Sequence, residues 1–304
     1  MNVIEAHGVG KRYGRSWALR DCTLAIPAGR VVALVGPNGA GKTTLLHLAV
    51  GLTAPSDGTI AVLDGVRPGS DEALTRIGFV AQDTPLYPTL SVADTLRLVA
   101  SLSSRWDEAN ARARLVDIDI PLNRKVGQLS GGQRSQVALA VALARHPELL
   151  ILDEPVARLD PLARHEFMAT LMVAVAEDGI SVLLSSHVVS ELQRVCDHLV
   201  VLSDGRPQVI GDVEDLVATH QVLTGPVADA DVAAGGATVV SDHRTDRQAT
   251  LLVRTAKPVV PPPGWHVAET NLEEIVLSYL RLPHASALPG PAASRGPAVD
   301  EMSA

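Results

Sequence analysis

The sequence predicts an α/β fold in which buried parallel strands alternate with helices. Residues 31–35 and 180–184 form short, continuous apolar runs of the kind found in strands that are covered on both faces, and residues 148–155 are interpreted as a further buried strand. Helical patterns lie between these runs, and such alternation is typical of a parallel sheet. Apolar residues make up 46% of the 304 residues and aromatic residues only 3%, so we expect a core of Val, Leu, Ile and Ala.

A glycine-rich loop follows the first of these strands and fits the pattern G-x-x-x-x-G-K-[ST]. The loop consists of Gly36, Pro37, Asn38, Gly39, Ala40, Gly41, Lys42, Thr43 and Thr44. Its glycines let backbone N–H groups approach a phosphate, and the dipole of the helix expected over 43–50 attracts negative charge. The alternative is a turn that only joins strand and helix, but the Lys-Thr pair at the helix start favours a phosphate-binding site.

The remaining elements are expected in alternating order. Residues 3–35 are interpreted as short strands separated by turns, and residues 92–145 as largely helical. Further strands are expected at 58–63, 77–80, 198–202 and 208–210, and further helices at 163–176 and 189–196.

The character of the sequence changes after the last of these strands. We predict a first domain over residues 1–212, in which about 83–145 form a helical subdomain. A small accessory domain is expected over 213–283, which combines a short helix, a loose stretch rich in Gly, Ala and Asp, and a strand at 249–253. Residues 284–304 are rich in Ala, Pro, Ser and Gly with little to bury, so we expect a disordered tail.

Composition limits the partners and the location that we expect. The net charge of −8 gives no general attraction to nucleic acid or to anionic membranes. Cys22 and Cys196 lie far apart without metal-binding spacing, so we interpret them as small buried hydrophobic residues in a reducing compartment. No run approaches the roughly 18–20 apolar residues that cross a bilayer, and the first residues do not form a signal peptide. We therefore expect a cytoplasmic protein.

Two further motifs narrow the chemistry of the phosphate loop. Residues 129–133 read Leu-Ser-Gly-Gly-Gln and open an Ala-rich helix, and a later buried strand ends in Asp153-Glu154. Together with the phosphate loop, and in this order, they resemble the ATP-binding cassette (ABC) ATPases over roughly residues 2–212. The resemblance implies an ABC ATPase core, with a mixed sheet and helices on both faces. It also implies an antiparallel β part, a helical subdomain and a small C-terminal extension, with ATP and Mg²⁺ as cofactors.

The resemblance assigns a role to each polar group near the phosphates. Lys42 would neutralise charge on the β- and γ-phosphates, Thr43 would ligate Mg²⁺, and Asp153 would hold Mg²⁺ through water. Glu154 would act as the general base that accepts a proton from the attacking water. Without the motifs around them, adjacent carboxylates at a strand end would more simply cap a helix or face solvent.

Three single residues match family positions. Gln82 resembles the glutamine that senses Mg²⁺ or water and contacts the membrane partner, so it is a further candidate metal ligand and catalytic residue. His187 resembles the switch histidine that touches the γ-phosphate, and Tyr13 resembles the aromatic residue that stacks on adenine. Each has a plainer interpretation, as a surface glutamine, a loop histidine and a core or hairpin tyrosine.

The family also implies a second ATPase subunit, either an identical copy or a paralogue. In this family the segment that corresponds to Ser130, Gly131, Gly132 and Gln133 touches the γ-phosphate bound to the other subunit. Asp160 matches an aspartate in the loop that crosses the dimer interface. At this place the family usually shows Ser-Gly-Leu-Asp, whereas this chain has Ala157-Arg158-Leu159-Asp160. We expect altered coupling between the two sites and retained activity.

The C-terminal extension suggests a subgroup. Thr270 and Glu273 fit a capping box before an amphipathic helix, and residues 271–277 resemble the end of drug-export (ABC-2, daunorubicin-type) ATPases. The alternative is a helix that docks on its own domain. The subgroup implies a separate membrane-spanning permease subunit, docked near residues 83–88, with this chain peripheral on the cytoplasmic face of the membrane.

Two other functions are possible for a chain with these motifs. A soluble ABC ATPase acting on ribosomes or nucleic acid usually has two cassettes, a coiled coil or zinc cysteines. This chain shows one cassette and no basic patch, so we expect no nucleic-acid partner. A regulator that binds nucleotide without hydrolysis is disfavoured by the intact Glu154 and His187.

Overall fold

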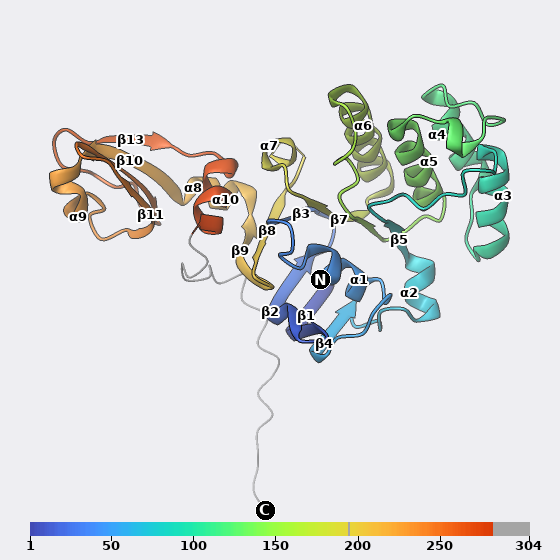
Figure 1. Ribbon diagram of the computed structural model, residues 1–304, viewed down its shortest axis with the longest axis horizontal. Coiled ribbons are helices and arrows are strands. Elements are labelled where there is room, and N and C mark those ends of the chain that lie inside the picture. Colours follow the sequence, from blue (N-terminus) through green and yellow to red (C-terminus); the bar gives the residue numbers. More distant parts are fainter. Residues whose placement is uncertain (194, 282–304) are drawn as a thin grey trace, which may run out of the picture.

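A six-stranded sheet forms the centre of the protein. The computed structural model describes residues 1–193 and 195–281 (Figure 1). The strand order is β5-β6-β7-β3-β8-β9. The strands are β3 (Val31–Val35), β5 (Ile77–Val80), β6 (Leu149–Leu152), β7 (Ser181–Ser186), β8 (His198–Ser203) and β9 (Arg206–Asp212). The first five strands of that order run parallel, and β9 pairs with β8 antiparallel, so the predicted mixed α/β sheet is confirmed.

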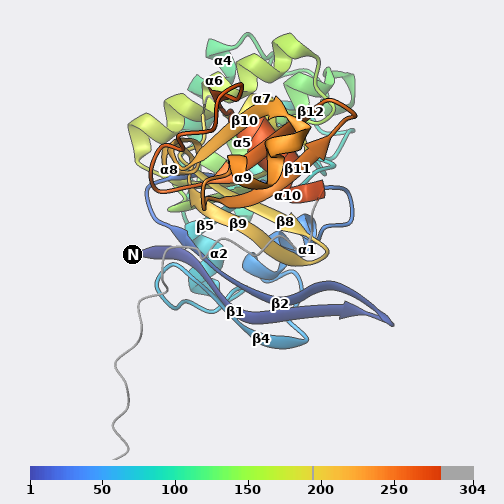
Figure 2. The same cartoon turned by 90° about the vertical axis from the view of Figure 1, so that its left-hand side faces the viewer.

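A second, antiparallel sheet packs over one face of the centre. It consists of β1 (Asn2–Tyr13), β2 (Ser16–Pro27) and β4 (Asp57–Val62), in the order β2-β1-β4, and lies below the central sheet in Figure 2. Helix α1 (Lys42–Ala49) shares one apolar cluster with this sheet and the central strands. The prediction of strands separated by turns before residue 35 is confirmed, but β1 and β2 are longer than expected, because register shifts in β1 around Gly8 and Gly10 absorb these glycines without a turn.

Helices cover the other face. The helices α3 (Val92–Leu102), α4 (Glu108–Asp117), α5 (Gly131–Leu143) and α6 (Pro161–Asp178) group on one side of the sheet in Figure 1. A short 3₁₀-helix (Val126–Gln128) precedes α5, and α2 (Asp71–Arg76) leads into β5. Apolar residues of α5 and α6 form one cluster with β3, β6 and β7, so the sheet is buried on both faces as expected.

The C-terminal part contains more strand than the sequence predicts. The strands β10 (His220–Pro226), β11 (Thr238–Arg244), β12 (Gln248–Arg254) and β13 (His266–Glu269) form an antiparallel sheet in the order β11-β12-β10-β13. The same part includes α8 (Val213–Ala218), a 3₁₀-helix (Val227–Asp229), α9 (Ala230–Ala233) and α10 (Leu272–Arg281). Only β12 was predicted, because it alone has a buried apolar run. All four residues of β13 are exposed and therefore leave no alternating pattern.

Helix α10 joins this part to the centre. It packs against α8, β8, β9, β11 and α7 (Val189–Leu192). Its start differs from the prediction by one residue, because the Asn271 side chain accepts a hydrogen bond from Glu274 N at 2.9 Å. The Asn271 amide in turn donates to the Glu274 carboxylate at 3.4 Å. The predicted Thr270–Glu273 capping box is therefore wrong.

Two expectations concern the outside of the fold. The tail predicted over 284–304 lies outside the described residues. Among the residues that the structure describes, no helix combines the length and apolar character needed to span a bilayer.

Both cysteines are buried as free thiols, and burial raises the pKa of each to about 12, which agrees with the expected hydrophobic role.

Candidate functional site

The candidate site residues gather at one edge of the central sheet. Gln82 follows β5, Asp153 follows β6, His187 follows β7, and Gly36 opens the phosphate loop after β3. These four strands are parallel neighbours in the sheet, so their carboxyl ends lie side by side. Ligands of open α/β sheets bind at this edge.

The phosphate loop is held close to its neighbours. Gly41 has a φ of +102°, and a Cβ there would lie 2.5 Å from the Ala18 carbonyl oxygen of β2. A Cβ on Gly36 would lie 2.2 Å from the Leu202 carbonyl oxygen of β8. Only glycine fits these two positions, and the loop therefore stays against β2 and β8 with its backbone fixed.

Lys42 is buried at the start of α1. Its side chain is only 4% exposed, and Nζ donates a hydrogen bond to the Gly36 carbonyl at 2.8 Å. The same Nζ lies 3.4 Å from Glu154 Oε1. A buried ammonium group requires such partners, because an unpaired charge in this environment is costly. Lys42 is therefore not a solvated surface lysine.

Ser185 on β7 connects the two carboxylates. Its hydroxyl donates to Asp153 Oδ1 at 2.7 Å and accepts a hydrogen bond from the Glu154 amide at 2.8 Å. Asp153 is 1% exposed, so this bond helps to satisfy a buried carboxylate. The sequence reasoning missed Ser185. The pairing of Leu152 with Leu184 places Asp153 opposite Ser185, and no local sequence pattern reveals this pairing.

Glu154 lies between a cation and a histidine. One carboxylate oxygen is near Lys42, and the other is 3.0 Å from His187 Nδ1. The backbone of Glu154 has a φ of +44°, in the left-handed region that non-glycine residues seldom adopt. Such strain is typical of functional sites, where the surrounding bonds hold it. The His187 side chain is 46% exposed, so the ring contacts both Glu154 and solvent.

Gln82 and Tyr13 are both exposed. Gln82 and Glu154 line a cavity of about 280 Å³, together with residues of the following loop and of α5. Tyr13 lies at the tip of the β1–β2 hairpin, and Lys11 Nζ is 5.2 Å from the centre of its ring. Tyr13 is therefore not a core residue, its place agrees with the plainer interpretation as a hairpin tyrosine, and its stacking on adenine stays a prediction.

The segment predicted to act on a second subunit caps α5. The Ser130 hydroxyl accepts a hydrogen bond from the Gln133 amide, and the Gln133 side chain accepts one from the Ser130 amide, each at 3.1 Å. Gly131 follows Ser130, and a Cβ on Gly132 would lie 2.7 Å from the Ala163 Cβ of α6. The structure therefore places this segment in the helical layer, and it gives Gly132 a packing role as well.

The loop before α6 carries a contact that the sequence did not reveal. Asp160 caps α6 by accepting bonds from the Leu162 and Ala163 amides at 3.1 and 3.0 Å. Arg158 forms an ion pair with Asp83, next to Gln82, with 3.1 Å between Nη2 and Oδ1. Arg158, where this chain departs from the usual family sequence, therefore links the loop before α6 to the loop after β5.

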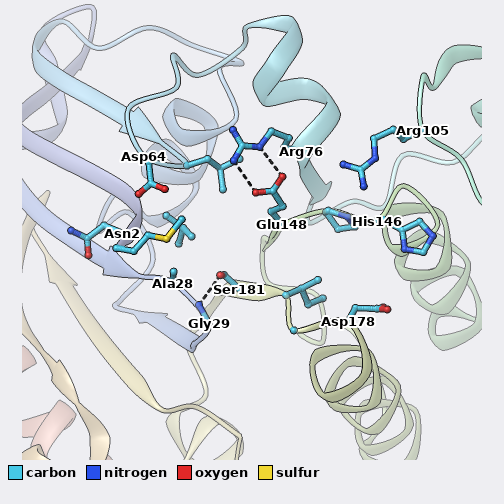
Figure 3. Close-up of a pocket in the computed structure, with 16 residues that line it drawn as sticks. Asn2, Ala28, Gly29, Asp64, Arg76, Arg105, His146, Glu148, Asp178 and Ser181 are labelled. Carbon is cyan, nitrogen blue, oxygen red and sulfur yellow. Dashed lines mark hydrogen bonds and ion pairs between the residues drawn. The ribbon is translucent and has the colours of Figure 1, made fainter.

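A second cavity lies near the amino ends of β6 and β7. It encloses about 420 Å³, and Figure 3 shows Arg76 and Glu148 paired at its wall. The two hydrogen bonds of this pair are each 2.8 Å long, and they lower the pKa of Glu148. None of the site residues predicted from the sequence lines this cavity. It is therefore separate from the candidate site.

Comparisons with known sequences agree on one family. The family model described as "ABC transporter" matches residues 19–157. The Nod factor export ATP-binding protein I of Cupriavidus pinatubonensis is 37% identical over 221 residues, which cover 71% of this chain and 68% of the relative. The protein of that name from Ralstonia nicotianae is 31% identical and aligns over 90% of this chain and 92% of its own length. The sulfate/thiosulfate import ATP-binding protein CysA of Vibrio vulnificus is 36% identical over 71% of this chain and 65% of its own.

Solved structures agree as well. An ATP-binding subunit of an ABC transporter superposes with a TM-score of 0.63 at 29% identity, covering 71% of this chain and 92% of that one. A dimeric post-hydrolysis state of the ATP-binding cassette MJ0796 bound to ADP and Pi gives a TM-score of 0.60 at 28% identity, with 69% and 98% covered. The cbiO1 protein of Clostridium perfringens, part of the ABC transporter complex cbiONQ, gives 0.61 at 28% identity, with 71% and 91% covered.

Proposed function

Because this chain belongs to the family of ABC transporter ATP-binding subunits, we propose that it powers export through a separate membrane-spanning permease. Family membership makes it an ATPase that binds ATP and works in a transport system. The observation that carries the proposal is the chain of contacts from buried Lys42 through Glu154 to the half-exposed His187, with Asp153 held beside Glu154 by Ser185.

The share of this chain that each relative covers bears on the direction of transport. The CysA relative, an importer subunit by name, aligns with 71% of this chain. The Ralstonia relative, an exporter subunit by name, aligns with 90% and therefore includes much of the part that follows the cassette. This longer match supports export. The daunorubicin-type subgroup stays a prediction, as do the domain limits at 1–212 and 213–283.

The phosphate loop and its neighbours fit ATP and Mg²⁺. Thr43, Gln82 and Asp153 offer hydroxyl, amide and carboxylate oxygens, which are the ligands that Mg²⁺ prefers. Among the described residues there is no metal-binding group of three or more His, Cys, Asp or Glu side chains. We therefore assign the metal to these mixed oxygen ligands. When bound, Mg²⁺ supplies charge neutralisation on the phosphates, and Lys42 adds to it.

Glu154 is positioned to act as the general base. It accepts a proton from the water whose oxygen forms a bond to the γ-phosphorus, while the bond from that phosphorus to the β–γ bridging oxygen breaks and ADP leaves. Lys42 and His187 contact its two carboxylate oxygens and hold the group in one orientation. Such positioning is a large part of catalysis in phosphoryl transfer.

Two partners complete the proposed machine. The first is a second ATPase subunit, which would meet the segment from Ser130 to Gln133 and the loop of Asp160. The second is the permease, which would dock where Tyr87 is exposed beside the cavity next to Gln82. ATP-dependent closure of the two ATPase subunits would then move the permease between states. This arrangement would hold the chain on the cytoplasmic face of the membrane.

The decisive variant is Glu154→Gln. We expect it to abolish ATP turnover, to retain ATP binding and to accumulate an ATP-bound dimer visible by size-exclusion chromatography with light scattering. Glu148→Gln, at the other end of β6, is the matched control and should keep its turnover. Full turnover in Glu154→Gln would refute the assigned base.

The partner proposal has its own experiment. The protein is purified from native membranes, and the co-purifying subunit is identified and reconstituted with it in vesicles. ATP-driven transport by a membrane-spanning subunit, directed away from the ATPase side, supports the exporter proposal. Recovery of ribosomes or nucleic acid in its place would favour the soluble alternative.

A further inference from the structure

His187 depends on its own short segment for its position. Its contact with Glu154 is at 3.0 Å, and nearly half of its side chain faces solvent. The backbone turns at this residue because the Val188 amide donates to the Ser186 hydroxyl at 3.0 Å. Helix α7 begins immediately afterwards, at Val189. The location of the histidine ring therefore depends on the end of β7 and on the location of α7.

Helix α7 is too short to be stable alone. It spans four residues, Val189–Leu192, and isolated helices of this length do not persist in water. Val189 and Leu192 are buried, at 7% and 1% exposure, and they provide the packing that holds the helix. The neighbours of these two residues therefore decide where α7 lies.

Helix α10 of the C-terminal part supplies one of the walls. It contacts α7 directly, and the two helices share one apolar cluster with β7 and β8. Ile275 and Val276 are fully buried in this cluster, together with Leu272 and Tyr279 at helical spacing. Helix α10 is itself held by the C-terminal sheet, since Tyr279 Oη lies 3.1 Å from His220 Nε2 of β10. A rigid element thus backs the segment that carries His187.

We infer that Ile275 and Val276 are positioning residues for ATP hydrolysis, which act on His187 through α7. This inference rests on the proposed role of His187. The C-terminal part would then set the rate of the ATPase: a shift of α10 moves α7, and the histidine leaves its place beside Glu154. Protein interiors are closely packed, so a displacement of one element is transmitted to its neighbours. The surrounding side chains relax only partly when a buried methyl or methylene group is removed, so such a change is felt nearby.

The test uses the full chain with Val276→Ala and a matched control, Leu251→Ala. Leu251 is also buried in the C-terminal part, but it belongs to a separate apolar cluster around Trp265. We expect Val276→Ala to lower kcat for ATP several-fold with an unchanged Kd for ATP, and Leu251→Ala to leave kcat unchanged. In a His187→Gln background, Val276→Ala should cause no further loss of kcat.

Hydrogen exchange provides a readout that does not depend on turnover. Val276→Ala should speed exchange over residues 186–193, whereas Leu251→Ala should not. Equal effects of the two alanine variants, or an equal loss of kcat with and without His187, would overturn the inference. If His187→Gln loses turnover while Val276→Ala keeps kcat and exchange unchanged, the inference alone fails. Full turnover in His187→Gln would overturn the proposed role of His187 and the inference with it.

Discussion

Ser185 is the residue on which the geometry of both carboxylates depends. Its single hydroxyl donates to buried Asp153 and accepts from the amide of Glu154. The second bond also holds Glu154 in its left-handed backbone conformation. A hydroxyl that makes two such bonds fixes Asp153 and Glu154, the proposed metal ligand and the proposed base, relative to each other.

Replacing Ser185 by Ala should therefore lower both turnover and stability. Removing one partner of a buried hydrogen bond costs about 1–3 kcal/mol. We expect a loss of this size in urea unfolding and at least a tenfold fall in kcat. Ser181→Ala is the matched control, since Ser181 lies on the same strand and accepts from the Gly29 amide at 2.9 Å. It should lose stability but keep kcat. Unchanged turnover in Ser185→Ala would contradict the assignment.

Arg158 is the residue where this chain departs from the usual family sequence. Its ion pair with Asp83 is 74% and 76% exposed, so we expect it to contribute at most about 1 kcal/mol. Arg158→Gly should change the cooperativity of ATP turnover and alter its rate by less than about fivefold. The effect should shrink at high ionic strength, because salt screens exposed pairs. Identical rate and cooperativity in both proteins at low salt would refute this coupling role.

At the scale of elements, local signals decided what the sequence could predict. The phosphate loop, the strands β3 and β6 and the carboxylates after β6 each carry a short pattern, and all were placed correctly along the chain. The role of Ser185 depends on which strand lies beside β6, and the ion pair of Arg158 on how two loops meet. Neither arrangement is written in a local pattern. β13 was missed for the opposite reason, since it has no buried face to produce alternation.

The junction of α8, β10 and α10 contains a buried histidine whose protonation opposes folding. His220 is 1% exposed and lies 2.7 Å from the Leu216 carbonyl oxygen through Nδ1. Burial lowers the pKa of His220, and the charge of Arg254 lowers it further. Burial also raises the pKa of Tyr279 to about 12, so its hydroxyl stays protonated and can donate to Nε2.

The pH dependence of stability follows from the lowered pKa of His220. The unfolded chain, with a histidine pKa of about 6.5, binds this proton more tightly than the folded protein. The contribution of neutral His220 to the stability of the folded protein is therefore complete above about pH 6.5. It is lost as the pH falls toward the pKa of His220 in the folded protein. Urea unfolding across this range should show a steeper decline for the parent protein than for His220→Gln. His266→Gln, on exposed β13, is the control and should follow the parent. Parallel curves for the parent and His220→Gln would contradict the assignment.

At the scale of the whole molecule, one apolar cluster joins the C-terminal part to the cassette, and a second cluster around Trp265 lies within the C-terminal part alone. A continuous apolar cluster runs from the strands β3, β6 and β7 to α8, β12 and α10. Apolar packing therefore continues across residue 212, where the sequence changes in character. Figure 1 shows the two parts extended along the long axis of the molecule, with α8 and α10 at the junction.

We predict that the described part of the chain unfolds in a single cooperative transition. The side chains of Leu272, Ile275, Val276 and Tyr279 are almost fully buried, and each contributes roughly 1.5–3 kcal/mol on burial. Their sum is comparable to the roughly 5–15 kcal/mol that stabilises a whole domain, so neither part should survive the loss of the other. Calorimetry should give one transition with equal calorimetric and van't Hoff enthalpies. A chain ended at residue 212 should expose this cluster and aggregate or melt at a markedly lower temperature. Two resolved transitions, or a stable truncated cassette, would show that the shared cluster does not couple the two parts.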